Sequence, residues 1–161
     1  MSYQEKKTIT TITSGALVLA AYCIYAISKF QSGLIGPGDM KFWAVAMLIF
    51  IGIGIVVTIV IQIVFHILMA ISIAIKEKIR DGKEIDKTFE ATVVEDEMDK
   101  LIELKSLRIG FAFFGVGFVA ALISLVLNAP PAVMLNIIFL SCSLGSLSEG
   151  FLSLYYYRKG I

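Results

Sequence analysis

Glu149 is the one formally charged side chain that lies more than a helical turn inside the apolar stretches of this 161-residue chain. An ionised carboxylate that faces lipid costs on the order of 2.5 kcal/mol or more, so such a residue normally faces other helices, binds a proton or finds a partner. Gln62 and His66 lie one helical turn apart in another apolar stretch and are its natural hydrogen-bond partners. Ser146 and Ser153 share the helical face of Glu149 through spacings of three and four residues. These residue types predict a polar pocket that contains a proton-titratable pair.

The same residues also have a purely structural interpretation. Hydroxyl and amide side chains in membrane helices commonly hydrogen-bond one another at modest energetic gain. Counting nine residues inward from Arg158 places Glu149 about 13 Å along the helix axis, in the inner leaflet rather than at the midplane. The sequence therefore leaves two interpretations open, a titratable pocket that faces the cytoplasm and a set of hydrogen bonds between helices.

Four apolar stretches must position these side chains. They predict membrane helices over about 8–28, 42–75, 107–127 and 133–157. About 20 apolar residues suffice to cross a hydrocarbon core of about 30 Å as a helix. The 34 residues between Lys41 and Lys76 carry no formal charge and would extend about 51 Å, so the second helix must tilt or emerge from the membrane. Trp43 is expected at the outer interface, where aromatic rings with a polar edge collect.

The basic residues predict how the chain is oriented. Eight of the 14 Lys and Arg residues lie between Lys76 and Arg108, and four more lie near the two ends of the chain. If these regions are cytoplasmic, 12 basic residues lie inside and only Lys29 and Lys41 outside, as the positive-inside rule expects. Together with 58% hydrophobic residues, this predicts an all-α, polytopic four-helix transmembrane bundle in the cytoplasmic membrane. Both termini are then inside, and a cytoplasmic helical segment, 76–106, separates the second and third helices.

The cytoplasmic segment carries signals of its own. Thr92 stands three residues before Glu95, a capping-box spacing that predicts a helix start. Met98, Leu101 and Ile102 recur at helical spacing, and we expect this apolar stripe to contact a partner protein. The basic residues expected to meet lipid headgroups are Lys105, Arg108, Arg158 and Lys159.

Several function classes are not expected from these residues. Cys23 and Cys142 are expected to be small buried thiols, and two Cys with one His lack the spacing of a zinc site. No phosphate-binding loop, nucleophile elbow or zinc-protease motif occurs, so we expect neither an enzyme nor a cofactor. A net charge of +1 also argues against direct binding of nucleic acid.

The stretch from Glu95 to Ile109, EDEMDKLIELKSLRI, resembles a signature of small, largely uncharacterised four-helix integral membrane proteins of bacteria and archaea. In that family an acidic run leads into a DLI-LK--RI-like sequence just before the third membrane helix, and here Met98 replaces what is commonly a basic residue. The resemblance implies no catalytic residues. It implies membrane proteins that are partners of small helix-turn-helix regulators encoded nearby.

Three functions from different classes follow as expectations. The first is a non-enzymatic membrane regulator or adaptor, in the bilayer as a monomer or homodimer, that contacts a cytoplasmic regulatory protein through 76–108. The second is a small homodimeric proton-coupled transporter in which Glu149 titrates. The third is a membrane sensor or lipid-binding protein that uses the inner-leaflet polar pocket.

Overall fold

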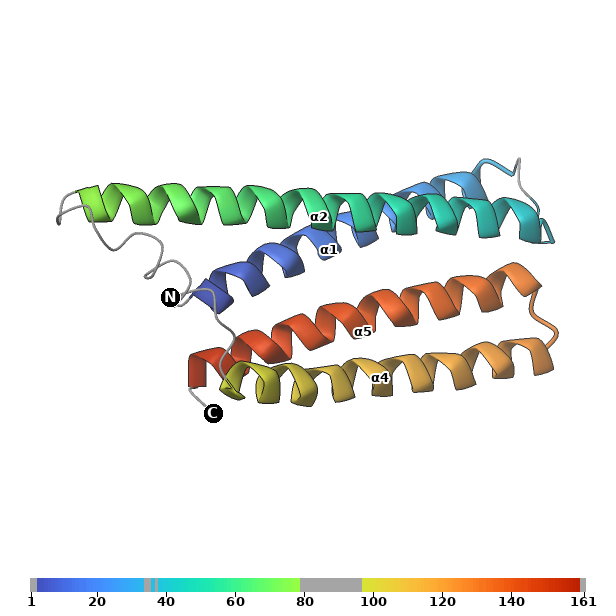
Figure 1. Ribbon diagram of the computed structural model, residues 1–161. Coiled ribbons are helices and arrows are strands. Elements are labelled where there is room, and N and C mark those ends of the chain that lie inside the picture. The colour runs from blue at the N-terminus through green and yellow to red at the C-terminus, as the bar shows by residue number, and fades with distance from the viewer. Residues whose placement is uncertain (1–2, 34–35, 37, 79–96, 160–161) are drawn as a thin grey trace.

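Four helices make up the part of the chain that the computed structural model describes, residues 3–33, 36, 38–78 and 97–159. They are α1 (Tyr3–Gln31), α2 (Met40–Lys78), α4 (Glu97–Val126) and α5 (Pro131–Lys159), and all four are long and apolar enough to cross a membrane. The helices run alternately in opposite directions (Figure 1). The start of α1 and the end of α5 therefore share one end of the bundle, which we call the terminal end; the opposite end is the turn end. The predicted all-α architecture of four helices is confirmed, and each helix has the length and apolar composition that a membrane span requires.

The helices extend beyond the apolar stretches from which they were predicted. α2 has 39 residues, which corresponds to about 58 Å, and α4 starts at Glu97 and continues unbroken into its apolar part. Charged residues end the apolar part of a helix, but the helix itself can continue through them, because Glu and Lys are good helix formers. The predicted helix start at Thr92 and Glu95 lies outside the described residues, as does 79–96, most of the predicted segment 76–106.

A tight turn joins α4 to α5. Asn128 has a positive φ of 58°, and its N–H donates to the carbonyl of Leu125 over 3.0 Å. The N–H of Ala129 donates to the carbonyl of Ser124 over 2.9 Å, which completes a Schellman motif and satisfies the last carbonyls of α4. α5 then begins at Pro131, whose fixed φ and missing N–H suit the first helical position.

α5 is the central element of the bundle. α4 packs along its full length, α1 packs against both α5 and α2, and α2 meets α5 chiefly near the turn end. Figure 1 shows α2 (green at its terminal end) and α5 (red at its terminal end) diverging towards the terminal end. This divergence decides which of the candidate side chains can meet.

The core lies near the turn end, where α1, α2 and α5 come together. Tyr22, Trp43, Met47 and Ala132 form a buried cluster there. Trp43 was expected at the lipid interface, but only 4% of it is exposed, so its ring packs between helices near the start of α2. The small side chain of Ala132 on α5 leaves room for this packing.

Candidate functional site

Glu149 lies on the side of α5 that faces α4. A Cβ built on Gly110 of α4 would lie 3.3 Å from Glu149 Oε2, and Glu103, about two turns earlier on α4, acts electrostatically on the same carboxylate. Gly110 is only two residues past Arg108, about 3 Å along the helix axis. Glu149 is therefore half-buried at the depth where the charged part of α4 ends and its apolar part begins.

Gln62 and His66 lie elsewhere in the bundle, against α1. They line a small cleft between α1 and α2 together with Lys7, Thr10 and Thr11; we call it the Lys7 cleft. The structure thus brings Gln62 and His66 together, as predicted, but it does not bring them to Glu149.

The separation of these residues has a simple cause. α2 has diverged from α5 at this level, so the neighbour that Gln62 and His66 reach is α1. Glu149 meanwhile points to α4, with which α5 makes its longest contact. The predicted pairing of Glu149 with His66 is corrected accordingly, and the predicted polar pocket is divided between two helix interfaces.

A large groove lies between α1, α2 and α5, and we call it the three-helix groove. It has a volume of about 730 Å³ and is lined by side chains from 11–19 of α1, 47–59 of α2 and 135–150 of α5. Ser146 lines this groove and is exposed. Ser153 is half-buried, one turn beyond Glu149 towards the terminal end.

Five hydroxyl groups line the three-helix groove, and all of them except that of Ser146 donate to carbonyls of their own helices. Thr11 Oγ1 donates to the Lys7 carbonyl over 3.1 Å, and Ser14 Oγ donates to the Thr11 carbonyl over 2.9 Å. Thr58 Oγ1 and Ser143 Oγ make equivalent bonds, of 2.8 and 2.9 Å, to the carbonyls four residues before them. The lining is therefore apolar in effect, with few donors left for a polar ligand.

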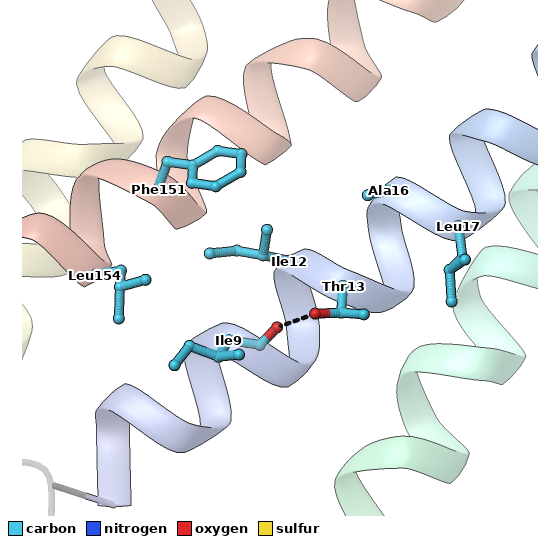
Figure 2. Close-up of a pocket in the computed structure, with 7 residues that line it drawn as sticks. All are labelled: Ile9, Ile12, Thr13, Ala16, Leu17, Phe151 and Leu154. Carbon is cyan, nitrogen blue, oxygen red and sulfur yellow. Dashed lines mark hydrogen bonds between the residues drawn. The ribbon is translucent and has the colours of Figure 1, made fainter. Parts of the chain in front are cut away.

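A second apolar hollow lies between α1 and α5, on another side of α1. Its volume is about 420 Å³. Figure 2 shows Phe151 and Leu154 of α5 facing Ile12 of α1, and the Thr13 hydroxyl donating to the Ile9 carbonyl over 2.8 Å. No charged side chain lines this hollow among the residues that the structure describes, so it offers a surface for hydrocarbon rather than a reaction centre.

The first turns of α4 hold the side chains predicted to contact a partner. Met98 and Leu101 are 43% and 57% exposed, as that prediction requires, and Leu104 joins them at 63%. Ile102 is corrected, because only 3% of it is exposed. It lies eight residues before Gly110, on the same helical face, which is turned towards α5.

The basic residues predicted at the headgroups gather at the terminal end. Lys105 Nζ lies 5.7 Å from the centre of the Tyr156 ring, and Lys159 Nζ lies 4.9 Å from that of Tyr155. Arg108 and Arg158 are exposed at the same end. Amphipathic tyrosines beside cations are typical of a membrane interface.

The sequence predictions did not include a polar contact near the turn end. The Tyr22 hydroxyl donates to Asn136 Oδ1 over 2.7 Å, and Asn136 Nδ2 donates to the carbonyl of Ala132 over 2.8 Å. Tyr22 is 1% exposed and also packs against the rings of Phe50 and Phe139. Asn136 is the residue from which the sequence could have predicted this contact, because a lone amide in an apolar stretch needs a hydrogen-bond partner.

Cys23 is half-buried and Cys142 is exposed, and both thiols are free. Exposure corrects the expectation of burial for Cys142, which lines the three-helix groove. Within the described ranges, no three His, Cys, Asp or Glu side chains are grouped so that they could hold a metal ion.

Comparisons with known proteins identified no relative of the chain. Neither the family models, nor the curated proteins, nor the solved structures contain a match to the chain. The resemblance of 95–109 to a membrane-protein signature therefore stays a prediction.

Proposed function

We propose that the chain is a non-enzymatic membrane regulator or adaptor that binds a cytoplasmic protein through the first turns of α4. The observation that carries this proposal is the exposed apolar stripe of Met98, Leu101 and Leu104, on a helix that is continuous with a membrane span. Charged residues surround the stripe, so this part of α4 does not belong to the hydrocarbon region.

The position of the stripe along α4 favours a protein partner over lipid. Leu101 and Met98 lie about 10 and 15 Å beyond Arg108 along the helix axis. The headgroup layer of one leaflet is only about 5 to 8 Å thick. These apolar side chains therefore extend into water, and covering each with a partner would contribute roughly 1.5–3 kcal/mol.

The cytoplasmic side is part of the proposal and rests on charge. Twelve basic residues gather at the two ends of the chain and between Lys76 and Arg108, against two elsewhere.

The alternative of proton-coupled transport gains no support from Glu149. Its place beside Gly110 is at the edge of the membrane, whereas a transport site is expected near the midplane.

The test compares two variants with equal changes of charge. Met98→Asp with Leu101→Asp changes the net charge by −2 and destroys the stripe. Lys100→Asp changes it by −2 as well, on an exposed position that leaves the stripe intact. Native chain and variants, expressed at equal levels in the host membrane, are crosslinked and purified, and the captured proteins are quantified.

We expect a defined cytoplasmic protein to be captured by the native chain and by Lys100→Asp, and to be lost from the double variant. The same captured set from all three would sink the proposal. So would a capture that contains only a second copy of the chain, because the stripe would then serve self-association.

A further inference from the structure

We propose that the three-helix groove binds one phospholipid from the surrounding bilayer, with an acyl chain held between α1, α2 and α5. The phosphate of that lipid would lie at the Lys7 cleft. This site goes beyond the proposed function and does not depend on the partner of α4. Its argument rests on the chemistry of the lining, the shape of the groove and the polar residues at one end of it.

The chemistry of the lining selects hydrocarbon. The groove lies between membrane-spanning parts of α1, α2 and α5, and its hydroxyls at Thr11, Ser14, Thr58 and Ser143 donate to carbonyls of their own helices. A polar solute entering this groove would lose its hydration without gaining equivalent hydrogen bonds. An acyl chain has no such loss, and it reaches the groove sideways from the lipid phase.

The groove is large enough for an acyl chain. Its α2 wall runs from Met47 to Ile59, about 18 Å, beside a volume of about 730 Å³. This volume falls in the range of about 300–1,000 Å³ that is typical of small-molecule sites.

The polar end of the site is the Lys7 cleft. Thr11 lines both the cleft and the groove, so the two are neighbours on α1. Lys7, Gln62 and His66 contribute nitrogen donors at the cleft, and a lysine near the membrane surface attracts an anionic headgroup. A phospholipid needs hydrogen-bond donors for its phosphate and an adjacent apolar groove for its acyl chain, and the cleft and the groove together provide both.

The decisive variants are two identical substitutions on α2. Gly54 lines the groove, and a Cβ built on it would lie 3.8 Å from Val18 Cγ1, an ordinary contact, so Gly54→Phe places its ring in the groove without a backbone clash. Gly52 has no heavy atom within 4 Å of its Cβ position, so Gly52→Phe adds the same ring outside the groove. On α5, Ser143→Phe and Leu144→Phe form a second such pair, because Ser143 lines the groove and Leu144 is 48% exposed.

The first measurement is native mass spectrometry of the intact chain released from nanodiscs of dioleoylphosphatidylglycerol and dioleoylphosphatidylcholine. We expect one phosphatidylglycerol to stay bound to the native chain, to Gly52→Phe and to Leu144→Phe. Gly54→Phe and Ser143→Phe should retain at least about tenfold less, because the ring takes the place of the chain. Phosphatidylcholine should be retained less than phosphatidylglycerol, and added inorganic phosphate should not displace the lipid, since most of the contact is to hydrocarbon.

The second measurement uses Trp43, the single tryptophan of the chain, which is buried one turn before the groove residue Met47. Lipids brominated near the end of the acyl chain should quench its fluorescence in the native chain and in Gly52→Phe, and much less in Gly54→Phe. Equal quenching or equal lipid retention across each matched pair overturns the proposal. Retention of no lipid by the native chain overturns it too, as does a two-chain species that disappears only when the groove is filled.

Discussion

The contact between α4 and α5 is close enough that one added methyl group should destabilise the protein. A Cβ built on Gly145 of α5 would lie 2.7 Å from the carbonyl oxygen of Gly110 on α4 and 3.5 Å from its carbonyl carbon. Both are backbone atoms of a helix and cannot rotate aside. Gly145→Ala therefore forces the two helices apart by several tenths of an ångström.

The expected cost follows from two opposing effects. Forcing an extra methyl into a well-packed contact typically costs about 1–3 kcal/mol, because neighbouring side chains lose contacts as the backbones separate. Alanine is a better helix former than glycine by up to about 1 kcal/mol. We expect Gly145→Ala to lower the free energy of unfolding by about 1–2 kcal/mol, a net loss because the separation affects the longest helix contact of the bundle.

The assay is reversible unfolding in one mixed-micelle condition, followed by circular dichroism, with a glycine control on α4. Gly115 has no heavy atom within 4 Å of its Cβ position, so Gly115→Ala should leave the free energy of unfolding unchanged or raise it. Gly117→Ala should behave like Gly145→Ala, because its Cβ would overlap the side chain of Ser141.

The comparison between the two alanine variants decides the matter. If Gly145→Ala proves as stable as Gly115→Ala, the backbones of α4 and α5 do not approach as closely as the structure shows. The reasoning would fail at its first step, because the whole predicted difference comes from the distance between Gly145 and the Gly110 carbonyl.

Two further predictions concern the turn end. Tyr22→Phe removes the hydroxyl that donates to Asn136, and we expect a loss of roughly 0.6–1.7 kcal/mol in the same unfolding assay, the range typical of such bonds in membranes. The loss should disappear in an Asn136→Leu background, and an unchanged loss there would contradict the assignment. Asn128→Val places a β-branched residue at a φ of 58° and should cost about 1–2 kcal/mol, whereas Asn128→Gly should be tolerated; equal stability of the two would argue against the left-handed turn.

The sequence predicts the position of a residue along its helix better than the direction in which its side chain points around that helix. Depth along a helix follows from counting residues, at about 1.5 Å each. That is why the four spans were found, and why the basic residues Lys105, Arg108, Arg158 and Lys159 were expected at one end, where the structure places them. Glu149 lies level with Gly110 of α4, two residues past Arg108, so it is close to the charged part of that helix.

Direction around a helix was harder to predict, and the Glu149 site shows why. In water the apolar face of a helix turns inward, but in lipid both faces are apolar and the pattern carries little information. His66 and Glu149 have compatible depths, yet they face α1 and α4 respectively. Their pairing required α2 and α5 to touch near the terminal end, and nothing in either apolar stretch indicates where those helices diverge.

Small residues supply the directional signal that hydropathy lacks, if their spacing is taken into account. Gly110, Gly115 and Gly117 of α4 could each allow another helix to approach closely, because glycine has no side chain. Successive helical residues turn by about 100°, so Gly110 and Gly117 fall within about 20° of each other, whereas Gly115 is rotated from Gly110 by about 140°. The structure follows this arithmetic, because Gly110 and Gly117 meet α5 while Gly115 is exposed. Gly110 and Gly117, seven residues apart, thus indicate the buried face of α4. Gly115 lies on the exposed side of the same helix, so Gly115→Ala is a matched control for substitutions on the buried face.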